Sequence, residues 1–125
     1  MPFNEAIAGR VRKSLQKRPD VVEKAMFGGI TFMVGGNMCC GVHRDDLILR
    51  LDPTTPVAAL GNSHARMWDF MKRPMPGMFA VAAAGCTDQA SVDRLVQMAL
   101  ERALSLPLKT KARAKSGRGR ARRPR

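Results

Sequence analysis

Two adjacent cysteines and a histidine lie close together in the segment Cys39-Cys40-Gly41-Val42-His43. Thiolates and imidazoles can bind zinc, and they can also serve as nucleophile and base in a thiol enzyme. A structural zinc site normally needs four ligands, with two to four residues between paired cysteines, and this spacing is missing. Side chains alternate along a strand, so Cys39 and Cys40 should face opposite sides of a sheet. We therefore expect no metal and no other cofactor here.

Cys39, His43 and Arg50 are the remaining candidates for catalysis, because the predicted sheet places all three on one face. Cys39 and His43 lie four strand residues apart, or about 13 Å, which is too far for a direct thiolate–imidazole contact. Gly28-Gly29 leads into a strand and is not followed by a helix, so it does not form a phosphate-binding loop. We expect no enzymatic activity, and a thiol-dependent enzyme stays the second alternative.

Helices are predicted near both ends of the segment that contains these residues. Phe3, Ile7, Val11 and Leu15 recur every four residues, which predicts an amphipathic helix that ends before Pro19. A second apolar stripe at helical spacing consists of Val92, Leu95, Val96, Ala99, Leu100, Ala103 and Leu104. Thr87, Asp88 or Ser91 are candidates to cap this second helix, and Pro107 stops it.

Short apolar segments between the two helices predict strands, because turn residues separate them. The predicted strands are 30–34, 38–42, 47–51, 65–70 and 78–82, with 21–26 as an extended lead-in and 54–60 as a short helix. The resulting order is α-β-β-β-α-β-β-α. This order predicts an α+β domain in which an antiparallel sheet of about five strands is covered by helices.

The length of the first hairpin loop decides which residues share a face of the sheet. We expect a three-residue loop, Gly35-Gly36-Asn37, because glycine and asparagine accept the left-handed conformation that such loops need. This loop pairs Val34 with Met38, Phe32 with Cys40 and Ile30 with Val42. Cys40 is then a core residue, while Cys39 lies on the opposite, half-solvated face.

Most of the net charge of +12 belongs to the end of the chain. Residues 109–125 hold nine of the 22 Lys and Arg residues and no acid, so 1–108 keeps 13 basic and 10 acidic residues. This end has too few apolar residues to offset the entropy of ordering, and we expect a folded domain over 1–108 and a disordered basic tail over 109–125. The candidate nucleic-acid contacts are Lys109, Lys111, Arg113, Lys115, Arg118, Arg120, Arg122, Arg123 and Arg125.

A group of aromatic and methionine residues is the candidate for protein recognition. Methionine adapts to irregular partners, and tryptophan is enriched at binding hot spots. The residues are Trp68, Phe70, Met71 and Met75. The alternative is that they fill the core or bury a dimer interface, which makes a second copy of the chain a further candidate partner.

Four segments together resemble the TfoX/Sxy N-terminal domain family over roughly residues 3–106. They are 23–32 (EKAMFGGITF), 37–42 (NMCCGV), 46–51 (DLILRL) and 73–78 (RPMPGM). The resemblance implies an α+β domain of the same element order and brings no catalytic residue. It also implies a link to natural competence in some bacteria, where full-length members act as transcriptional co-activators with the cyclic-AMP receptor protein.

These observations predict a regulatory or adaptor domain without enzymatic activity, linked to transcription, whose basic tail binds DNA or RNA. The first alternative is a module for protein interaction or dimerisation with no role in nucleic-acid binding. The sequence has no membrane-length apolar run and no secretory signal, and its odd number of cysteines fits reduced thiols. We therefore expect a cytoplasmic protein, associated with the nucleoid if the tail binds DNA.

Overall fold

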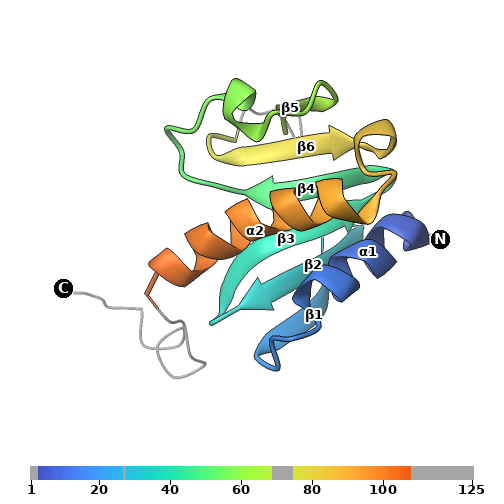
Figure 1. Cartoon of the computed structure of the whole chain (residues 1–125). Helices are drawn as coiled ribbons and strands as arrows, with labels where there is room; N and C mark the ends of the chain where they lie inside the picture. The colour runs from blue at the N-terminus through green and yellow to red at the C-terminus, as the bar shows by residue number, and fades with distance from the viewer. Residues whose placement is uncertain (1–2, 27, 69–74, 108–125) are drawn as a thin grey trace.

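A single antiparallel sheet carries both α-helices on one of its faces (Figure 1). The computed structural model describes residues 3–26, 28–68 and 75–107. The sheet has six strands in the order β1-β2-β3-β4-β6-β5. The predicted α+β class is confirmed, and the sheet has one strand more than expected.

The strands follow the predicted apolar segments closely, with two differences. Their bounds are β1 Val21–Met26, β2 Gly29–Val34, β3 Asn37–His43, β4 Asp46–Arg50, β5 Ala65–Met67 and β6 Met78–Ala82. The expected lead-in 21–26 is a full strand, because all six of its residues pair with β2. The strand predicted over 65–70 ends at Met67, and its last two residues lie outside the described part. The short helices are η1, Val57–Leu60, and η3, Ala83–Gly85.

Both α-helices begin at a residue whose side chain caps them. Helix α1 spans Glu5–Leu15, and the Asn4 side chain accepts hydrogen bonds from the backbone N–H groups of its first turn. Helix α2 spans Gln89–Ser105 and is capped by Asp88, one of the three predicted candidates. Side chains that accept these otherwise unpaired N–H groups typically contribute about 1 kcal/mol each.

The main core lies between the helices and the sheet. Its largest fully buried side chains include Phe32 and Phe79 from the sheet and Ile7 and Leu95 from the helices. A smaller cluster on the opposite face consists of Ile48, Trp68 and Ala80, with Met38, Met75 and Met78 packed against it. The sheet therefore carries the helices on one face and a small apolar cluster over part of the other.

The β2–β3 hairpin differs from the predicted register near its turn. Phe32 pairs with Cys40 and Ile30 with Val42, as expected. Val34, however, pairs with Asn37 and not with Met38, so the turn contains only two residues, Gly35 and Gly36. The register shifts next to Phe32, which leaves Cys39 as an extra residue in β3.

This irregularity changes the predicted position of Cys39. A β-bulge interrupts the alternation of side chains, so two consecutive residues can face the same side. Cys39 and Cys40 are both fully buried in the helix-side core, whereas Met38 belongs to the opposite cluster. The prediction that Cys39 lies on a half-solvated face, and Met38 on the core face, was wrong for this reason.

Candidate functional site

The two helices run side by side in the same direction and are joined by a partly exposed hydrogen-bond network. The Gln89 amide donates to the Arg10 carbonyl oxygen and to Asp93 Oδ1, both at 2.8 Å, and contacts Ser14 Oγ at 3.2 Å. The Ser14 hydroxyl donates to the Asp93 carboxylate. Residue 10 therefore meets residue 89 and residue 14 meets residue 93, a constant offset that requires parallel helices.

The charge of Asp93 is stabilised within this network. Hydrogen bonds from Ser14 and then from Gln89 lower the pKa of the Asp93 carboxyl, and the nearby Lys13 ammonium acts in the same direction. A carboxylate that accepts several hydrogen bonds favours its charged form. The network thus fixes the relative position of the helices and keeps one acid ionised beside the basic side chains of α1.

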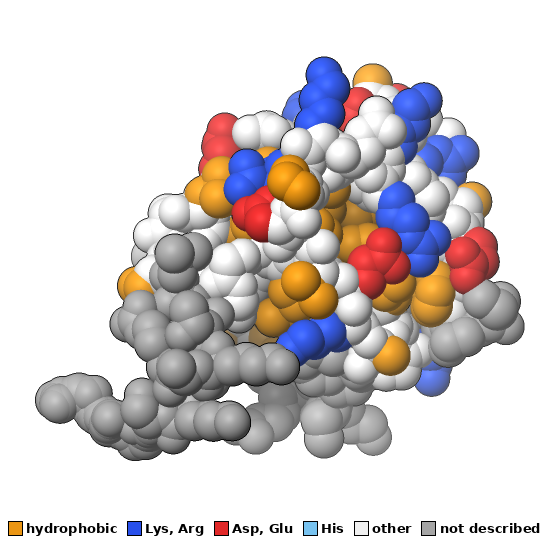
Figure 2. Space-filling view, turned by 90° about the horizontal axis from the view of Figure 1, so that it is seen from below, with side chains coloured by type: hydrophobic (Ala, Val, Ile, Leu, Met, Phe, Trp, Pro, Cys, Tyr) orange, Lys and Arg blue, Asp and Glu red, His pale blue; other side chains and the backbone are white. Residues whose placement is uncertain are grey.

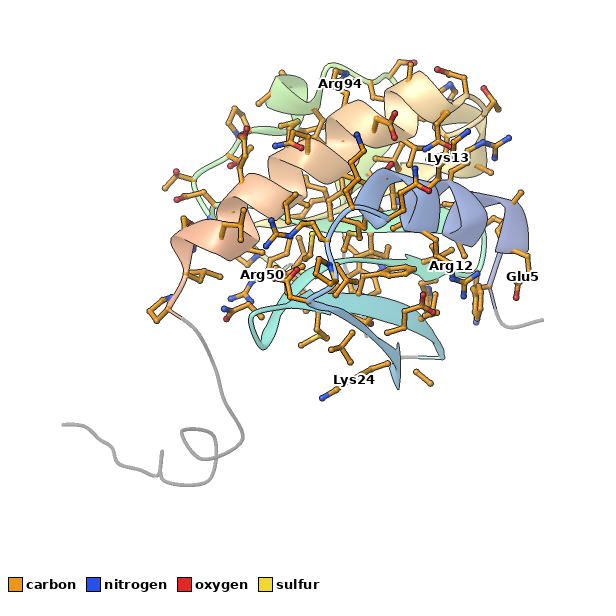
Figure 3. All side chains as sticks on the ribbon, turned by 60° about the horizontal axis from the view of Figure 1, so that its bottom comes forward. Glu5, Arg12, Lys13, Lys24, Arg50 and Arg94 are labelled. Atoms are coloured by element: carbon orange, nitrogen blue, oxygen red, sulfur yellow. The ribbon has the colours of Figure 1, made fainter. Side chains whose placement is uncertain are left out.

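The basic residues of α1 and the turn after it fall into two groups. Arg12 donates to Glu23 at 3.0 and 3.1 Å, and Arg18 pairs with Asp20 at 2.8 Å. By contrast, Arg10, Lys13 and Lys17 have no carboxylate within ion-pair distance among the described residues. Helical spacing places Arg10 and Lys13 on one flank of α1, toward α2, and Lys17, in the turn after the helix, lines the same groove as Lys13. Figure 3 shows Lys13 on the outside of the helix layer.

A shallow groove of about 280 Å³ follows this flank between the helices. It is lined by Lys13, Ser14, Gln16, Lys17, Asp93, Val96, Gln97 and Leu100. Its ammonium and amide groups are donors to which the oxygens of an anion can bind. The four-residue spacing of the two lysines was a visible sequence signal, but only the parallel helix pair shows that they border a common groove.

The second helix ends beside the first hairpin of the sheet. The Asn37 side chain, which is buried, donates to the Pro107 carbonyl oxygen at 2.8 Å. This bond anchors the end of α2 to the β2–β3 turn. Since α1 and α2 are parallel, Pro107 and Lys17 both lie toward the C-terminal ends of their helices. Pro107 is the last described residue, so the basic segment follows this anchored end of α2 in the sequence.

The residues predicted for protein recognition are only partly within the described structure. Trp68 is 5% exposed, and its ring lies 5.8 Å from that of His43. Met75 is half-buried against the same cluster. Phe70 and Met71 lie outside the described residues, as do all nine basic residues of the tail. Binding by any of these residues stays a prediction.

The three candidates for thiol chemistry are separated by the sheet. Cys39 faces the helix-side core, whereas His43 and Arg50 belong to the opposite face. A hydrogen bond with the Cys39 thiol, together with burial, raises the pKa of Cys40 well above its ordinary value. Burial likewise raises the pKa of Cys86 to about 11. Reactive cysteines need a lowered pKa and access to solvent, so these thiols have the properties of core residues.

Two negative findings apply to the described ranges 3–26, 28–68 and 75–107. No three His, Cys, Asp or Glu side chains there come close enough to hold a metal ion. No helix within the same ranges is long and apolar enough to cross a membrane.

The entry into β2 has two adjacent glycines with different structural roles. Gly28 has a φ of +75°, which L-residues with side chains rarely adopt, and a Cβ on Gly29 would lie 2.1 Å from the Val42 carbonyl oxygen.

A comparison with protein-family models matches residues 13–103 to the TfoX N-terminal domain. The chain belongs to the TfoX N-terminal domain family. Comparisons with curated proteins and with solved structures gave no match.

Proposed function

We propose that this TfoX-family domain is a non-enzymatic regulator linked to transcription, and that it binds nucleic acid through residues 109–125. The charge distribution carries the proposal: nine of the 22 basic residues are in that segment, and no acid accompanies them. Neutralising phosphates with Lys and Arg releases condensed counterions, and this gives affinity that does not depend on sequence. A fully extended segment of this length could reach over about 55 Å of nucleic-acid backbone.

The folded domain adds a basic surface along the groove between its two helices. Lys13 and Lys17 border the groove between the helices, and Arg10 precedes them on the same flank. Residues four apart on a helix are separated by about 6 Å along its axis. This surface supports an interface in which the segment supplies most of the phosphate contacts and α1 supplies a few more.

The experiment that tests the proposal is a titration of duplex DNA at several salt concentrations. The full-length chain and a protein truncated after residue 108 are compared, since the described core and its hydrogen bonds lie within 3–107. Each phosphate contact contributes about −0.9 to the slope of log K against log salt. We expect a slope of roughly −4 to −8 for the full chain and a slope no steeper than about −2 for the truncated protein.

A matched pair of variants separates α1 from general basicity. Lys13→Gln/Lys17→Gln removes two charges beside the groove, and Arg50→Gln/Arg66→Gln removes two from the opposite face of the sheet. The first pair should make the slope shallower by up to about 2, while the second leaves it unchanged. Equal affinity of full-length and truncated proteins at every salt concentration would rule out the proposed role of the segment.

A further inference from the structure

The sheet has one long edge that no strand of the described residues covers. Strand β1 pairs only with β2, and its six residues form one edge of the sheet. The other edge, β5, is only three residues long. An uncovered edge presents unpaired N–H and C=O groups that can pair with another chain, and proteins usually keep such edges short or charged. The length of β1 therefore makes it the stronger candidate for pairing.

The side chains of β1 alternate between apolar and charged on the face away from the helices. Val22 pairs with Met33 and Lys24 pairs with Thr31, so both point to that face. Val22 is 52% exposed, the second-highest exposure among the large apolar residues of the described part. Figure 2 looks at the molecule from the β1 side and shows hydrophobic side chains exposed among charged ones. Figure 3 shows Lys24 at this edge, pointing away from the helices.

The opposite face of β1 is already engaged within the domain. Glu23 accepts two hydrogen bonds from Arg12 at 3.0 and 3.1 Å, and Arg12 also approaches Glu5 at 3.8 Å. The side chains of β1 that a second strand at this edge could contact are therefore those on the Val22 face.

Two copies of β1 can pair antiparallel about a two-fold axis perpendicular to the sheet. Homo-oligomers with closed symmetry are the commonest kind, and two-fold dimers are the commonest of these. With this axis, the helix-side faces of the two sheets lie on the same side of the joined sheet. Each β1 residue therefore lies opposite a residue of the second copy whose side chain points to the same side. In every symmetric register one β1 residue lies on the axis, opposite the same residue of the second copy, and the registers differ in which residue this is.

Charge distinguishes these registers. A register centred on Glu23 opposes two glutamates, and one centred on Lys24 opposes two lysines; like charges directly opposite are destabilising. A register centred on Val22 opposes the two valines and places Lys24 of each copy opposite Asp20 of the other. Asp20 immediately precedes the strand, is exposed and pairs with Arg18 of its own chain at 2.8 Å, so Lys24 of the second copy would add a second cation to this carboxylate. This register contains two complementary pairs and no like-charged pair.

We propose that the chain forms a two-fold dimer through β1, with Val22 opposite Val22 and Lys24 opposite Asp20 of the second copy. The dimer joins the two sheets into one sheet of twelve strands. On the face away from the helices, Val22 lies beside Met33, which pairs with Met38 in the next strand. The two copies of this row meet at the axis and form one continuous apolar row, which covers the side of Val22 that faces the open edge. The proposal does not depend on nucleic-acid binding.

The test is the dimer dissociation constant of the full-length chain, measured by sedimentation equilibrium. Val22→Asp should abolish the dimer, because it places two carboxylates opposite each other at the axis. Lys24→Asp and Asp20→Lys each turn both charge pairs into like-charge pairs, and each should weaken the dimer by about tenfold or more. The double variant Asp20→Lys/Lys24→Asp restores opposite charges and should return the constant to within about threefold of the original.

Arg94→Asp is the matched control, because it makes the same charge change on an exposed residue of α2, far from Lys24 in Figure 3. It should leave the dissociation constant unchanged. Circular dichroism establishes that each variant is folded before its constant is compared. A monomeric wild-type chain would overturn the proposal, as would a dimer that withstands Val22→Asp. Failure of the double variant to restore association would overturn the register.

Discussion

Substituting Gly29 by alanine should destabilise the domain, because the added methyl group would push strands β2 and β3 apart. An added Cβ at this position would lie 2.1 Å from the Val42 carbonyl oxygen and 3.1 Å from the His43 Cα atom. Ordinary van der Waals contact begins at 3.4 Å. The obstacle is the backbone of β3, which cannot rotate away as a flexible side chain would. The β2 and β3 backbones must therefore separate by about 1 Å near Gly29.

The expected cost follows from this displacement. A strand hydrogen bond of about 2.9 Å that lengthens by 1 Å is no longer a hydrogen bond. The loss of about two such bonds costs roughly 2 kcal/mol, and forced overpacking adds about 1–3 kcal/mol. Since the two contributions overlap, Gly29→Ala should lower the free energy of unfolding by about 2–4 kcal/mol.

Urea unfolding followed by tryptophan fluorescence measures this cost. Trp68 is the only tryptophan and is buried, so its emission should shift when the domain unfolds. Gly9→Ala is the control: Gly9 is an exposed residue within α1, and no atom lies within 4 Å of its added Cβ. This control should stabilise the domain by about 0.5–1 kcal/mol, because alanine favours helix. A Gly29→Ala protein within about 0.5 kcal/mol of wild type would refute the reasoning.

Three further predictions concern the helix pair, the thiols and the end of α2. The pKa of Asp93 is lowered in the folded state, so its contribution to stability is present above about pH 4 and is lost as the pH falls through the folded-state value. Asp93→Asn should therefore destabilise the domain at neutral pH and converge with wild type in acid, as measured by urea unfolding from pH 7 to pH 2; a pH-independent difference would contradict this. All three cysteines are buried, so a thiol reagent at pH 8 should label none in the native protein and three in urea, and rapid native labelling would count against their burial. Asn37→Ala removes the bond to Pro107 and leaves that carbonyl without this partner, which should cost about 1–2 kcal/mol and speed hydrogen exchange in the last turn of α2; unchanged exchange would argue against the anchor.

The spacing of apolar residues along the sequence predicted those helices and strands that bury one apolar face. The four-residue spacing of Ile7, Val11 and Leu15 identified α1 because those side chains have to share one buried face. The pairing of Phe32 with Cys40 was also predicted correctly, although from a three-residue loop; in the structure a two-residue turn and a bulge together give the same pairing. The family motif also has a local basis, since Gly28 needs a positive φ and Gly29 has no room for a Cβ.

The sequence did not predict the features that depend on a single irregular residue or on a long-range polar contact. Cys39 is the extra residue of a bulge, and alternation along β3 cannot indicate where alternation is interrupted. The contact of Ser14 with Asp93 joins residues 79 positions apart, and neither residue type indicates its partner. The groove beside Lys13 follows from that contact, and so it could not be predicted earlier.

The salt dependence of DNA binding tests the proposed function most directly. The full-length chain and the protein truncated after residue 108 are titrated with the same duplex across a range of salt concentrations. We predict that affinity of the full chain falls steeply with salt, that truncation removes most of this dependence, and that Lys13→Gln/Lys17→Gln removes a smaller part. Identical affinities and slopes for the full-length and truncated proteins would contradict the proposal.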